Sequence, residues 1–357
     1  MNIAYSCYGF HSDYRIQGGL FFSSPECVAT YAYTIVNELV DRGHKVYRLM
    51  PDRDAEHVRQ KGEQAFSAFS NSSRWRAYQA LGKWVHPSLK NMPKLDAILL
   101  DWRWPIPGRN TALDAKSDTF QPDLMLQTET IRWAHKEHVP IIAIDHDYKM
   151  TLDDDEQVNF VLEFGWKRGG EHHVDFPCKH DELLQFKTIR PLNRIAYVGN
   201  RYERDEAFSQ YVAPLIHDYL EVHVYGNWLE NERDSASRWP SIKFHSRIHP
   251  GEIYDAYYRA ICVPLLLKPD YNQHGFMTER VWEAILFGSV PIQLGDFKSD
   301  VQYVPRELVA NSALELGHIA QMLYRYPQLR DEYRTRIAKD LAFMDVKNFI
   351  DKVLSLT

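Results

Sequence analysis

The hydrophobic positions of this chain form short apolar runs that alternate with longer segments of helical periodicity. The first run, 2–8, leads through a glycine-bearing loop into apolar residues at helical spacing from about Glu26 to Arg42, where Gly43 ends the pattern. Short apolar runs indicate buried strands, and apolar positions three and four apart indicate amphipathic helices. A regular alternation of the two predicts α/β layers built on parallel sheets.

The rest of the chain repeats this alternation in two halves. In the first half, strands are expected at 45–50, 95–101, 140–145 and 172–176, and a helix at 123–137. The segment 177–193 has two prolines and no apolar period, so we expect a linker there. In the second half, strands are expected at 194–199, 221–226, 242–245, 261–267 and 290–294, and helices at 203–219, 251–259, near Arg280 and within 327–356.

These patterns predict an α/β fold of two doubly wound, Rossmann-like domains that face a central cleft, with helices at the C-terminus. A length of 357 residues agrees with about two domains. The expected division is an N-terminal domain at 1–176, a linker at 177–193, a second domain at 194–340, and a C-terminal helix at 341–357 that packs back on the first domain. Ligands of such sheets bind at the carboxyl ends of the strands.

Composition excludes several classes of protein. Apolar residues make up 45% and charged residues 25% of the chain, as in a globular protein. No segment approaches the roughly 20 apolar residues of a membrane span, and the N-terminus lacks the basic start and long apolar stretch of a signal peptide. The cysteines have no CxxC spacing, which favours reduced thiols in a cytoplasm; they are Cys7, Cys27, Cys178 and Cys262.

The helix expected near Arg280 has a pattern with a clear chemical meaning. Its first turns carry Arg280 and Glu283. Unpaired amides and the macrodipole favour anions at a helix start, and an arginine there adds a cradle for a diphosphate. A carboxylate three residues later on the same face can accept two ribose hydroxyls, and a diphosphate beside a ribose describes a nucleotide sugar. The alternative is an ordinary surface ion pair between the two side chains.

Four segments of the second half, in the same order along the chain, resemble one known family. They are 197–204, 225–227, 244–248 and 280–283. They resemble the phosphate loop, a strand-end turn, the uracil-side segment and the donor helix of the two-domain, GT-B type glycosyltransferases, and specifically of the bacteriophage DNA β-glucosyltransferases. The similarity is strong over 194–297 and weaker but collinear over the N-terminal half.

The resemblance implies a UDP-sugar donor, with UDP-glucose expected first. It assigns the diphosphate to Arg201, Arg204, Tyr271 and Arg280, the ribose to Glu283, the uracil to backbone near Ile248, and the adjoining loops to Gly199, Tyr225 and Gly226. A charge-assisted hydrogen bond between arginine and phosphate contributes about 1.5–3 kcal/mol. Because three arginines could together hold the donor, no divalent metal is expected to be required for donor binding.

Transfer to a hydroxyl needs a general base, and the resemblance implies one at a strand's carboxyl end. It places the catalytic carboxylate at Asp147, with His146 beside it, directly after the run 140–145. Glu26 matches a glutamate near the transferred sugar or the acceptor, and its alternative is a plain helix-start carboxylate. Asp101 ends a strand one unit earlier and is the competing candidate for the base.

Two metal sites are weighed against this interpretation. Asp145 and Asp147 form an Asp-x-Asp pair, which another large class of glycosyltransferases uses to bind manganese. The Arg280 helix and the second α/β half argue against that class. A second group lies close in sequence but lacks the ligand spacing of a helix or hairpin, so chance composition is the preferred explanation; it contains His172, His173, Cys178 and His180.

The predicted function is an inverting, UDP-sugar-dependent glycosyltransferase. The implied acceptor is a hydroxyl on a modified pyrimidine of phage double-stranded DNA, flipped out of the helix. The net charge of −6 leaves room only for a local basic surface, with Lys83, Arg103 and Arg109 as candidates. We expect a monomer without a membrane segment, in the cytoplasm of a phage-infected bacterial host. The alternatives are a GT-B glycosyltransferase for a small molecule or cell-surface glycan, and a non-catalytic nucleotide-sugar or DNA-binding module.

Overall fold

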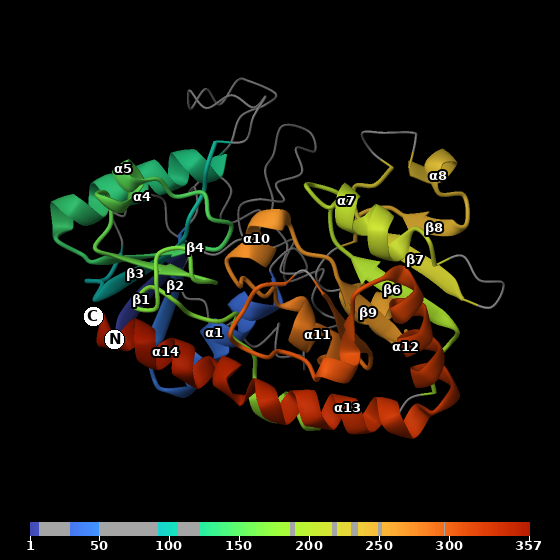
Figure 1. The fold of residues 1–357 in the computed structure, drawn as a ribbon. Coiled ribbons are helices and arrows are strands. Elements are labelled where there is room, and N and C mark those ends of the chain that lie inside the picture. The colour runs from blue at the N-terminus through green and yellow to red at the C-terminus, as the bar shows by residue number, and fades with distance from the viewer. Residues whose placement is uncertain are drawn as a thin grey trace, which may run out of the picture. The chain divides into compact units, whose positions relative to one another are not determined.

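The structure is a computed structural model that describes most of the chain. The described residues are 1–6, 29–49, 92–105, 122–185, 190–215, 220–229, 235–248, 252–295 and 297–357. They form two compact units, Met1–Val174 with Val346–Thr357, and Asp175–Asp345. Each unit contains one sheet of parallel strands flanked by helices (Figure 1), which confirms the predicted α/β fold. The segment 177–193 lies within the second unit, and 341–357 divides between the units after Asp345.

The sheet of the first unit has the strand order β2-β1-β3-β4-β5. Its strands are β1 (Asn2–Ser6), β2 (Lys45–Arg48), β3 (Ala97–Asp101), β4 (Ile141–Asp145) and β5 (Phe160–Glu163). Its helices are α1 (Thr30–Asp41), α4 (Pro122–Glu137), α5 (Leu152–Asp155), and α14 (Val346–Ser355). Figure 1 shows α4 on one side of this sheet and α1 with α14 on the other.

Strands β3 and β4 are buried along their whole length. This is expected of central parallel strands that are covered on both faces, and it explains why each was visible as a continuous apolar run. Each strand ends in an aspartate, Asp101 or Asp145, that is only 1% exposed. Buried carboxylates require hydrogen-bond partners, so the carboxyl end of this sheet must supply them.

The last strand of this unit is not where the hydrophobic pattern placed it. The prediction of a strand at 172–176 is wrong, because the fifth strand is β5 (Phe160–Glu163) and His173 forms only an isolated bridge with Glu163. Alternating polar and apolar residues in 172–176 imitate a half-buried strand. By contrast, β5 is only four residues long and follows the polar turn of α5, so it offers little pattern to detect.

The sheet of the second unit has the order β11-β10-β9-β6-β7-β8. Its strands are β6 (Arg194–Val198), β7 (Glu221–Tyr225), β8 (Ile242–His245), β9 (Cys262–Leu265), β10 (Val290–Leu294) and β11 (Val309–Ala310). Its longer helices are α11 (Arg280–Leu286), α12 (Ala313–Arg325) and α13 (Pro327–Asp340). Its short helical segments are α6 (His180–Leu183), α7 (Asp205–Ala207), η3 (Phe208–Val212), α8 (Ser235–Arg238), α9 (Ile253–Tyr257), α10 (Pro269–Gln273), η5 (Arg306–Leu308) and η6 (Leu341–Met344).

Most predicted elements of the second unit are confirmed. The five expected strands correspond to β6 to β10, whereas β11 was not predicted. Of the helix expected at 203–219, the described part up to 215 forms a single turn, α7, that continues as the π-helical segment η3. None of the helices in the described stretches is long and apolar enough to cross a membrane.

Two fully buried arginines on α13 fix the position of α11. Arg330 donates hydrogen bonds to the carbonyls of Ala260, at 2.8 Å, and Gly288, and Arg334 donates to the carbonyl of Ile285 at 3.0 Å. Ile285 and Gly288 lie at the C-terminal end of α11, where carbonyls have no partner within the helix. The two arginines therefore cap α11 and hold it in place against the sheet.

Candidate functional site

The second sheet reverses its strand order between β6 and β9, which makes a switch point there. Ligands of doubly wound sheets bind at the carboxyl ends of strands beside such a point. Three predicted donor-site residues come to this edge: Gly199 follows β6, Gly226 follows β7, and Arg280 begins α11. The sequence order of these residues gave no distance between them, and the structure supplies it.

Gly199 and Gly226 join the ends of β6 and β7 side by side. The Gly199 amide donates to the carbonyl of Tyr225 at 2.9 Å, and the Trp228 indole donates to the carbonyl of Gly199 at 2.7 Å. Gly226 has φ +149°, and a Cβ there would lie 2.2 Å from the Gly199 carbonyl oxygen. Only glycine fits at position 226. Because Gly226 approaches Gly199 so closely, backbone atoms rather than side chains lie at the ends of β6 and β7.

Replacing Gly226 with alanine is expected to destabilise the protein by about 1–3 kcal/mol, because the substitution adds a clash to an unfavourable backbone conformation. Chemical denaturation measures the change. Gly43→Ala is the control, since Gly43 has φ +83° but a Cβ there would meet nothing within 4 Å. Equal losses in the two variants would show that the contact with Gly199 contributes nothing.

Arg280 lies against the Gly199 loop. Its Nε donates to the carbonyl of Val198 at 2.6 Å and its Nη1 to the Thr278 hydroxyl at 3.3 Å, and its guanidinium lies 5.6 Å from the centre of the Tyr197 ring. A Cβ on Gly199 would lie 2.8 Å from Nη2 of Arg280. The guanidinium is thus fixed at the carboxyl end of β6, directly beside the glycine backbone.

Electrostatics keep Arg280 charged. Burial acts to lower its pKa, but the neighbouring Tyr197, Tyr257, Glu283 and Glu279 outweigh burial, so the pKa of Arg280 is raised. Glu283 is 2% exposed and lies one turn further along α11. Burial also raises the pKa of Tyr257, which is 0% exposed and therefore stays neutral.

The two arginines predicted to bind phosphate beside Arg280 are held by protein groups in the structure. Arg201 donates to the Asp205 carboxylate at 2.6 Å and to the Ser235 hydroxyl at 2.9 Å. Arg204 is 5% exposed and donates to the carbonyls of Leu266, Asn200 and Tyr202 at 3.1, 3.2 and 3.0 Å. Because Leu266 follows β9, Arg204 ties the loop after β6 to the other side of the switch point.

The remaining predicted donor residues have packing contacts. The Tyr225 ring stacks on the His245 imidazole with centroids 4.3 Å apart, and both Tyr225 and Ile248 pack against a core cluster beneath β6. Tyr271 is 5% exposed in α10, with the Lys268 ammonium 4.8 Å from its ring centre. These contacts fix the side chains but do not join Tyr271 to Arg280.

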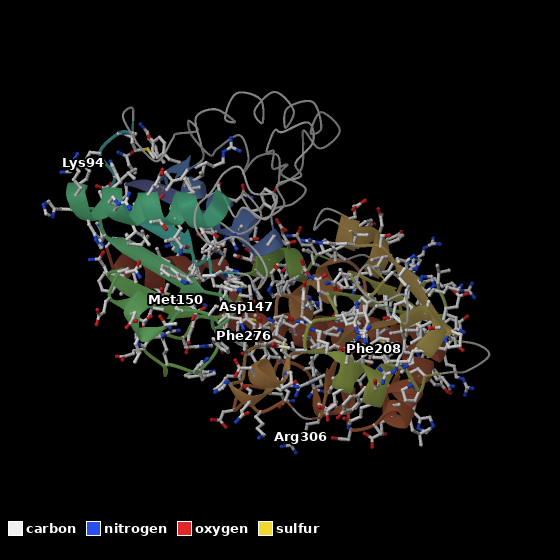
Figure 2. The ribbon with its side chains drawn as sticks, turned by 90° about the horizontal axis from the view of Figure 1, so that it is seen from above. Lys94, Asp147, Met150, Phe208, Phe276 and Arg306 are labelled. Carbon is white, nitrogen blue, oxygen red and sulfur yellow. The ribbon has the colours of Figure 1, made fainter. Side chains whose placement is uncertain are left out.

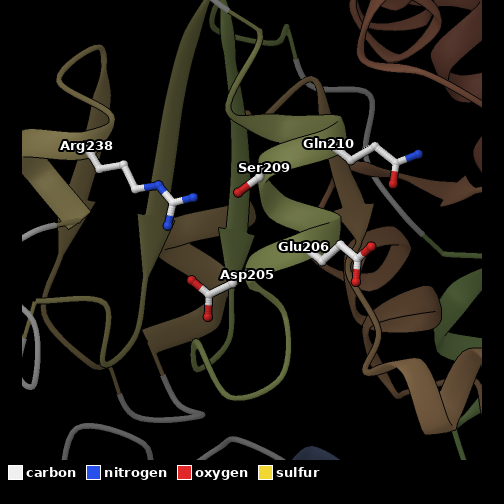
Figure 3. Close-up of a pocket in the computed structure, with 5 residues that line it drawn as sticks. All are labelled: Asp205, Glu206, Ser209, Gln210 and Arg238. Carbon is white, nitrogen blue, oxygen red and sulfur yellow. The ribbon is translucent and has the colours of Figure 1, made fainter.

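A surface hollow of about 540 Å³ lies close to these loops (Figure 3). Figure 3 shows Asp205 and Ser209 pointing toward Arg238, with Glu206 and Gln210 turned the other way. One of its lining residues, Asp205, is the partner of Arg201. We assign no ligand to this hollow.

In the first unit, Asp147 and His146 lie in the turn after β4, and both are partly exposed. Asp147 is labelled in Figure 2. The His146 ring lies 5.8 Å from the Trp104 ring. Asp147 therefore meets two requirements for a base: it follows a strand end and can be reached from solvent. Glu26, also predicted for this site, lies outside the described residues, as do Lys83 and Arg109.

The preceding aspartate has a different role. One Asp145 oxygen accepts from the Lys149 amide at 2.8 Å, and the other accepts from the Met150 amide at 3.2 Å and from Arg168 at 2.8 Å. An Asp-x-Asp metal site would need both carboxylates to be available. Because Asp145 is committed to an arginine and two amides, the alternative of a manganese-binding pair is disfavoured.

Asp101, the competing base, is 1% exposed. Its carboxylate accepts from the Tyr31 hydroxyl at 2.7 Å and the Tyr5 hydroxyl at 3.4 Å. These two hydroxyls give the buried Asp101 carboxylate the hydrogen-bond partners that it needs at the end of β3, which is a structural role.

Arg103, two residues after Asp101, is 6% exposed and does not form the exposed basic surface that was predicted for it.

The second candidate metal site, made of His172, His173, Cys178 and His180, does not form in the structure. The imidazoles of His172, His173 and His180 lie 3.1, 2.8 and 2.7 Å from the backbone carbonyls of Val161, Gly165 and Ala338, and Cys178 is a buried free thiol. Within the described stretches, no group of three or more His, Cys, Asp or Glu side chains is arranged to hold a metal.

Sequence reasoning missed several residues that shape the site. Tyr197, Trp228 and Arg168 contact Arg280, Gly199 and Asp145 respectively. The position of Trp228 directly after the Gly226 turn was one available signal. Arg168 had none, because it lies 23 positions from Asp145 on a different segment.

No family model and no curated protein matches this sequence. Solved structures do match its fold. The T4 phage β-glucosyltransferase is 13% identical over 99% of both chains, with a TM-score of 0.60. Other structures of the T4 enzyme hold its substrate UDP-glucose or UDP with Mn²⁺. A structure described as the DNA-modifying enzyme β-glucosyltransferase is also 13% identical over 99% of both chains, with a TM-score of 0.59.

A second kind of glycosyltransferase also matches. An enzyme involved in avilamycin A biosynthesis is 10% identical, with 99% of this chain and 98% of that chain covered and a TM-score of 0.53. At these identities the likeness establishes the fold. The chain therefore has the two-domain GT-B fold of glycosyltransferases, as the resemblance in its sequence predicted.

Proposed function

We propose that this protein is an inverting, UDP-sugar-dependent glycosyltransferase. The observation that carries the proposal is the placement of Arg280 beside Gly199 and Gly226 at the switch point of the second sheet. A charged guanidinium beside the glycine backbone at the strand ends suits a diphosphate. Glu283 on the same helix suits the ribose.

The proposed chemistry uses two groups. Asp147 takes the proton from an acceptor hydroxyl, and the oxygen attacks the anomeric carbon from the face opposite the UDP leaving group. Negative charge then grows on the diphosphate, and Arg280 stabilises it without reorganising. Arg201, Arg204 and Tyr271 would assist, with Arg201 exchanging Asp205 for phosphate. His146 would lie beside the reacting hydroxyl.

We further propose that the acceptor is a hydroxyl on a modified pyrimidine of phage double-stranded DNA. Support comes from the order of the matching motifs and from the fold shared with a DNA-modifying β-glucosyltransferase. A base inside a duplex cannot reach a catalytic carboxylate, so the nucleotide would be flipped out of the helix. The protein would act as a monomer in the cytoplasm of the infected bacterial host, where such DNA is made.

A small-molecule acceptor is the second candidate. It is favoured by the shared fold with the avilamycin enzyme and by the net charge of −6, which does not attract DNA. A non-catalytic binding module is the third, and a base-like Asp147 in a reachable turn argues against it.

One assay tests the proposed acceptor. The protein is incubated with several UDP-sugars and with hydroxymethylated DNA, unmodified DNA or no acceptor, and release of UDP is followed. Release that requires hydroxymethylated DNA is expected. Equal release with unmodified DNA would refute the modified-base acceptor, and binding of UDP without any release would leave the small-molecule acceptor and the binding module as the candidates. An arm with a chelator tests the proposal that no divalent metal is required, since one T4 structure holds Mn²⁺ with UDP.

DNA binding is expected to weaken steeply with salt, because any local basic surface must act against a net charge of −6. The logarithm of the binding constant should fall with the logarithm of salt concentration at a slope of about −0.9 per phosphate contacted. Fluorescence anisotropy at several salt concentrations measures the slope. Absence of binding at low salt, with and without UDP, would favour the small-molecule acceptor.

A further inference from the structure

Arg168 lies between three carboxylates beside the turn that carries Asp147. Its Nη1 contacts Asp145 at 2.8 Å and Glu163 at 3.3 Å, and its Nη2 contacts Asp155 at 3.1 Å. Nη2 also donates to the carbonyl of Met150 at 3.3 Å. The guanidinium therefore joins the ends of β4 and β5 to α5 and to the end of the turn.

Two of these carboxylates are neighbours that would otherwise repel. Asp145 and Glu163 are paired positions on adjacent parallel strands, and they are 1% and 0% exposed. Burial raises the pKa of Glu163, Arg168 opposes that rise, and the charge of Asp145 adds to it. Two neighbouring carboxylates repel when both are charged, and Arg168 contacts both as a shared counter-ion.

The turn itself depends on the orientation of Asp145. Its carboxylate accepts the Lys149 and Met150 amides, so it closes the loop 145–150 from inside. Tyr148 in this loop has φ +55°, a conformation that needs support from its surroundings, and the Lys167 ammonium lies 5.2 Å from its ring centre. Asp147 lies in the middle of this loop, which is held by the carboxylate of Asp145 and by Arg168, the partner of Asp145.

We propose that Arg168 is a positioning residue for Asp147, acting through Asp145. The proposal rests on the proposed role of Asp147 as the general base. A general base must be held near its productive position, and a displacement of about 1 Å can lower turnover by about 100-fold. Arg168 holds the carboxylate of Asp145, Asp145 holds the amides of the loop, and the loop presents Asp147.

Buried charge is a poor means of stabilising a fold, because loss of hydration often exceeds the attraction gained. What an arginine shared among three carboxylates does supply is a fixed orientation for each of them. The cluster holds the loop that carries the candidate base, so the orientation that it fixes has chemical value. Lysine cannot replace it fully, since an ammonium lacks the planar fork that bridges separate acceptors.

The test compares Arg168→Gln and Arg168→Lys with the wild type, with Arg132→Gln as the control at an exposed position on α4. Hydrogen exchange reports the loop directly through the amides of Lys149 and Met150. Steady-state kinetics report kcat and the KM for the UDP-sugar. We expect exchange in 145–150 to become about 10-fold faster or more in Arg168→Gln, while kcat falls by about 10- to 100-fold and the donor KM stays within a few-fold. Arg168→Lys should recover part of both losses.

The outcomes distinguish the two steps of the proposal, which are that Arg168 holds the loop and that the loop positions Asp147. Unchanged exchange in Arg168→Gln would show that Arg168 does not hold the loop, and faster exchange with unchanged kcat would show that the loop does not position the base. If the wild type transfers no sugar, the role of Asp147 fails, and the exchange measurement still decides whether Arg168 fixes the loop. Asp155→Asn removes only the more exposed contact and serves as a second variant should Arg168→Gln fail to fold.

Discussion

Replacing Asp147 with asparagine is expected to lower the turnover number by about 10²–10⁴-fold, while affinity for the UDP-sugar changes little. Asparagine keeps the shape and the hydrogen-bonding capacity of the side chain but cannot take a proton. Asp147 is partly exposed in the turn after β4, so the substitution disturbs no core. Turnover is measured by UDP release under saturating donor, and donor affinity by calorimetry.

Asp101→Asn is the matched comparison. Position alone favours Asp101, since β3 borders the point at which the strand order of the first sheet reverses. Burial favours Asp147, because the Asp101 carboxylate is 1% exposed and accepts from Tyr31 and Tyr5. We therefore expect Asp101→Asn to lower thermal stability and leave turnover within a few-fold. An inactive Asp101 variant beside an active Asp147 variant would reverse the assignment.

The elements that could be predicted from the sequence are those whose burial is continuous. Strands β4, β6 and β9 were each found within a few residues of their bounds, because strands covered on both faces form unbroken apolar runs. Short elements with mixed burial could not be found in this way. For example, β11 is two residues long, and β5 was missed in favour of the alternating pattern at 172–176.

The sequence predicts which residues of the candidate site reach the sheet edge, but it does not predict the contacts of their side chains. A residue just after a strand lies at that edge, which is why the positions of Gly199, Gly226 and Asp147 in the fold could be predicted. Side-chain partners are a different matter. The ion pair of Arg201 with Asp205 has an i,i+4 spacing that could have indicated it, whereas Arg204 donates to the carbonyl of Leu266, 62 positions away, and nothing in the spacing of Arg204 reveals this. Such contacts depend on segments brought together only by the fold.

Arg280→Ala is expected to weaken UDP binding by about 1.5–3 kcal/mol, or about 10- to 150-fold. The guanidinium lies beside the Gly199 backbone at the carboxyl end of β6, so its removal takes away the cation on which the proposed diphosphate site depends. Calorimetry with UDP measures the loss. Arg306→Ala, at an exposed position of the same unit, is the control and should bind as the wild type does.

Arg280 also donates to the carbonyl of Val198, so the alanine variant should lose some stability as well as affinity. Arg280→Lys separates the two effects, because it keeps the charge and loses the planar fork. We expect the lysine variant to bind UDP with an affinity between those of the wild type and Arg280→Ala. If UDP affinity is unchanged in a folded Arg280→Ala protein, the diphosphate does not bind at the switch point, and the proposed donor site fails with it.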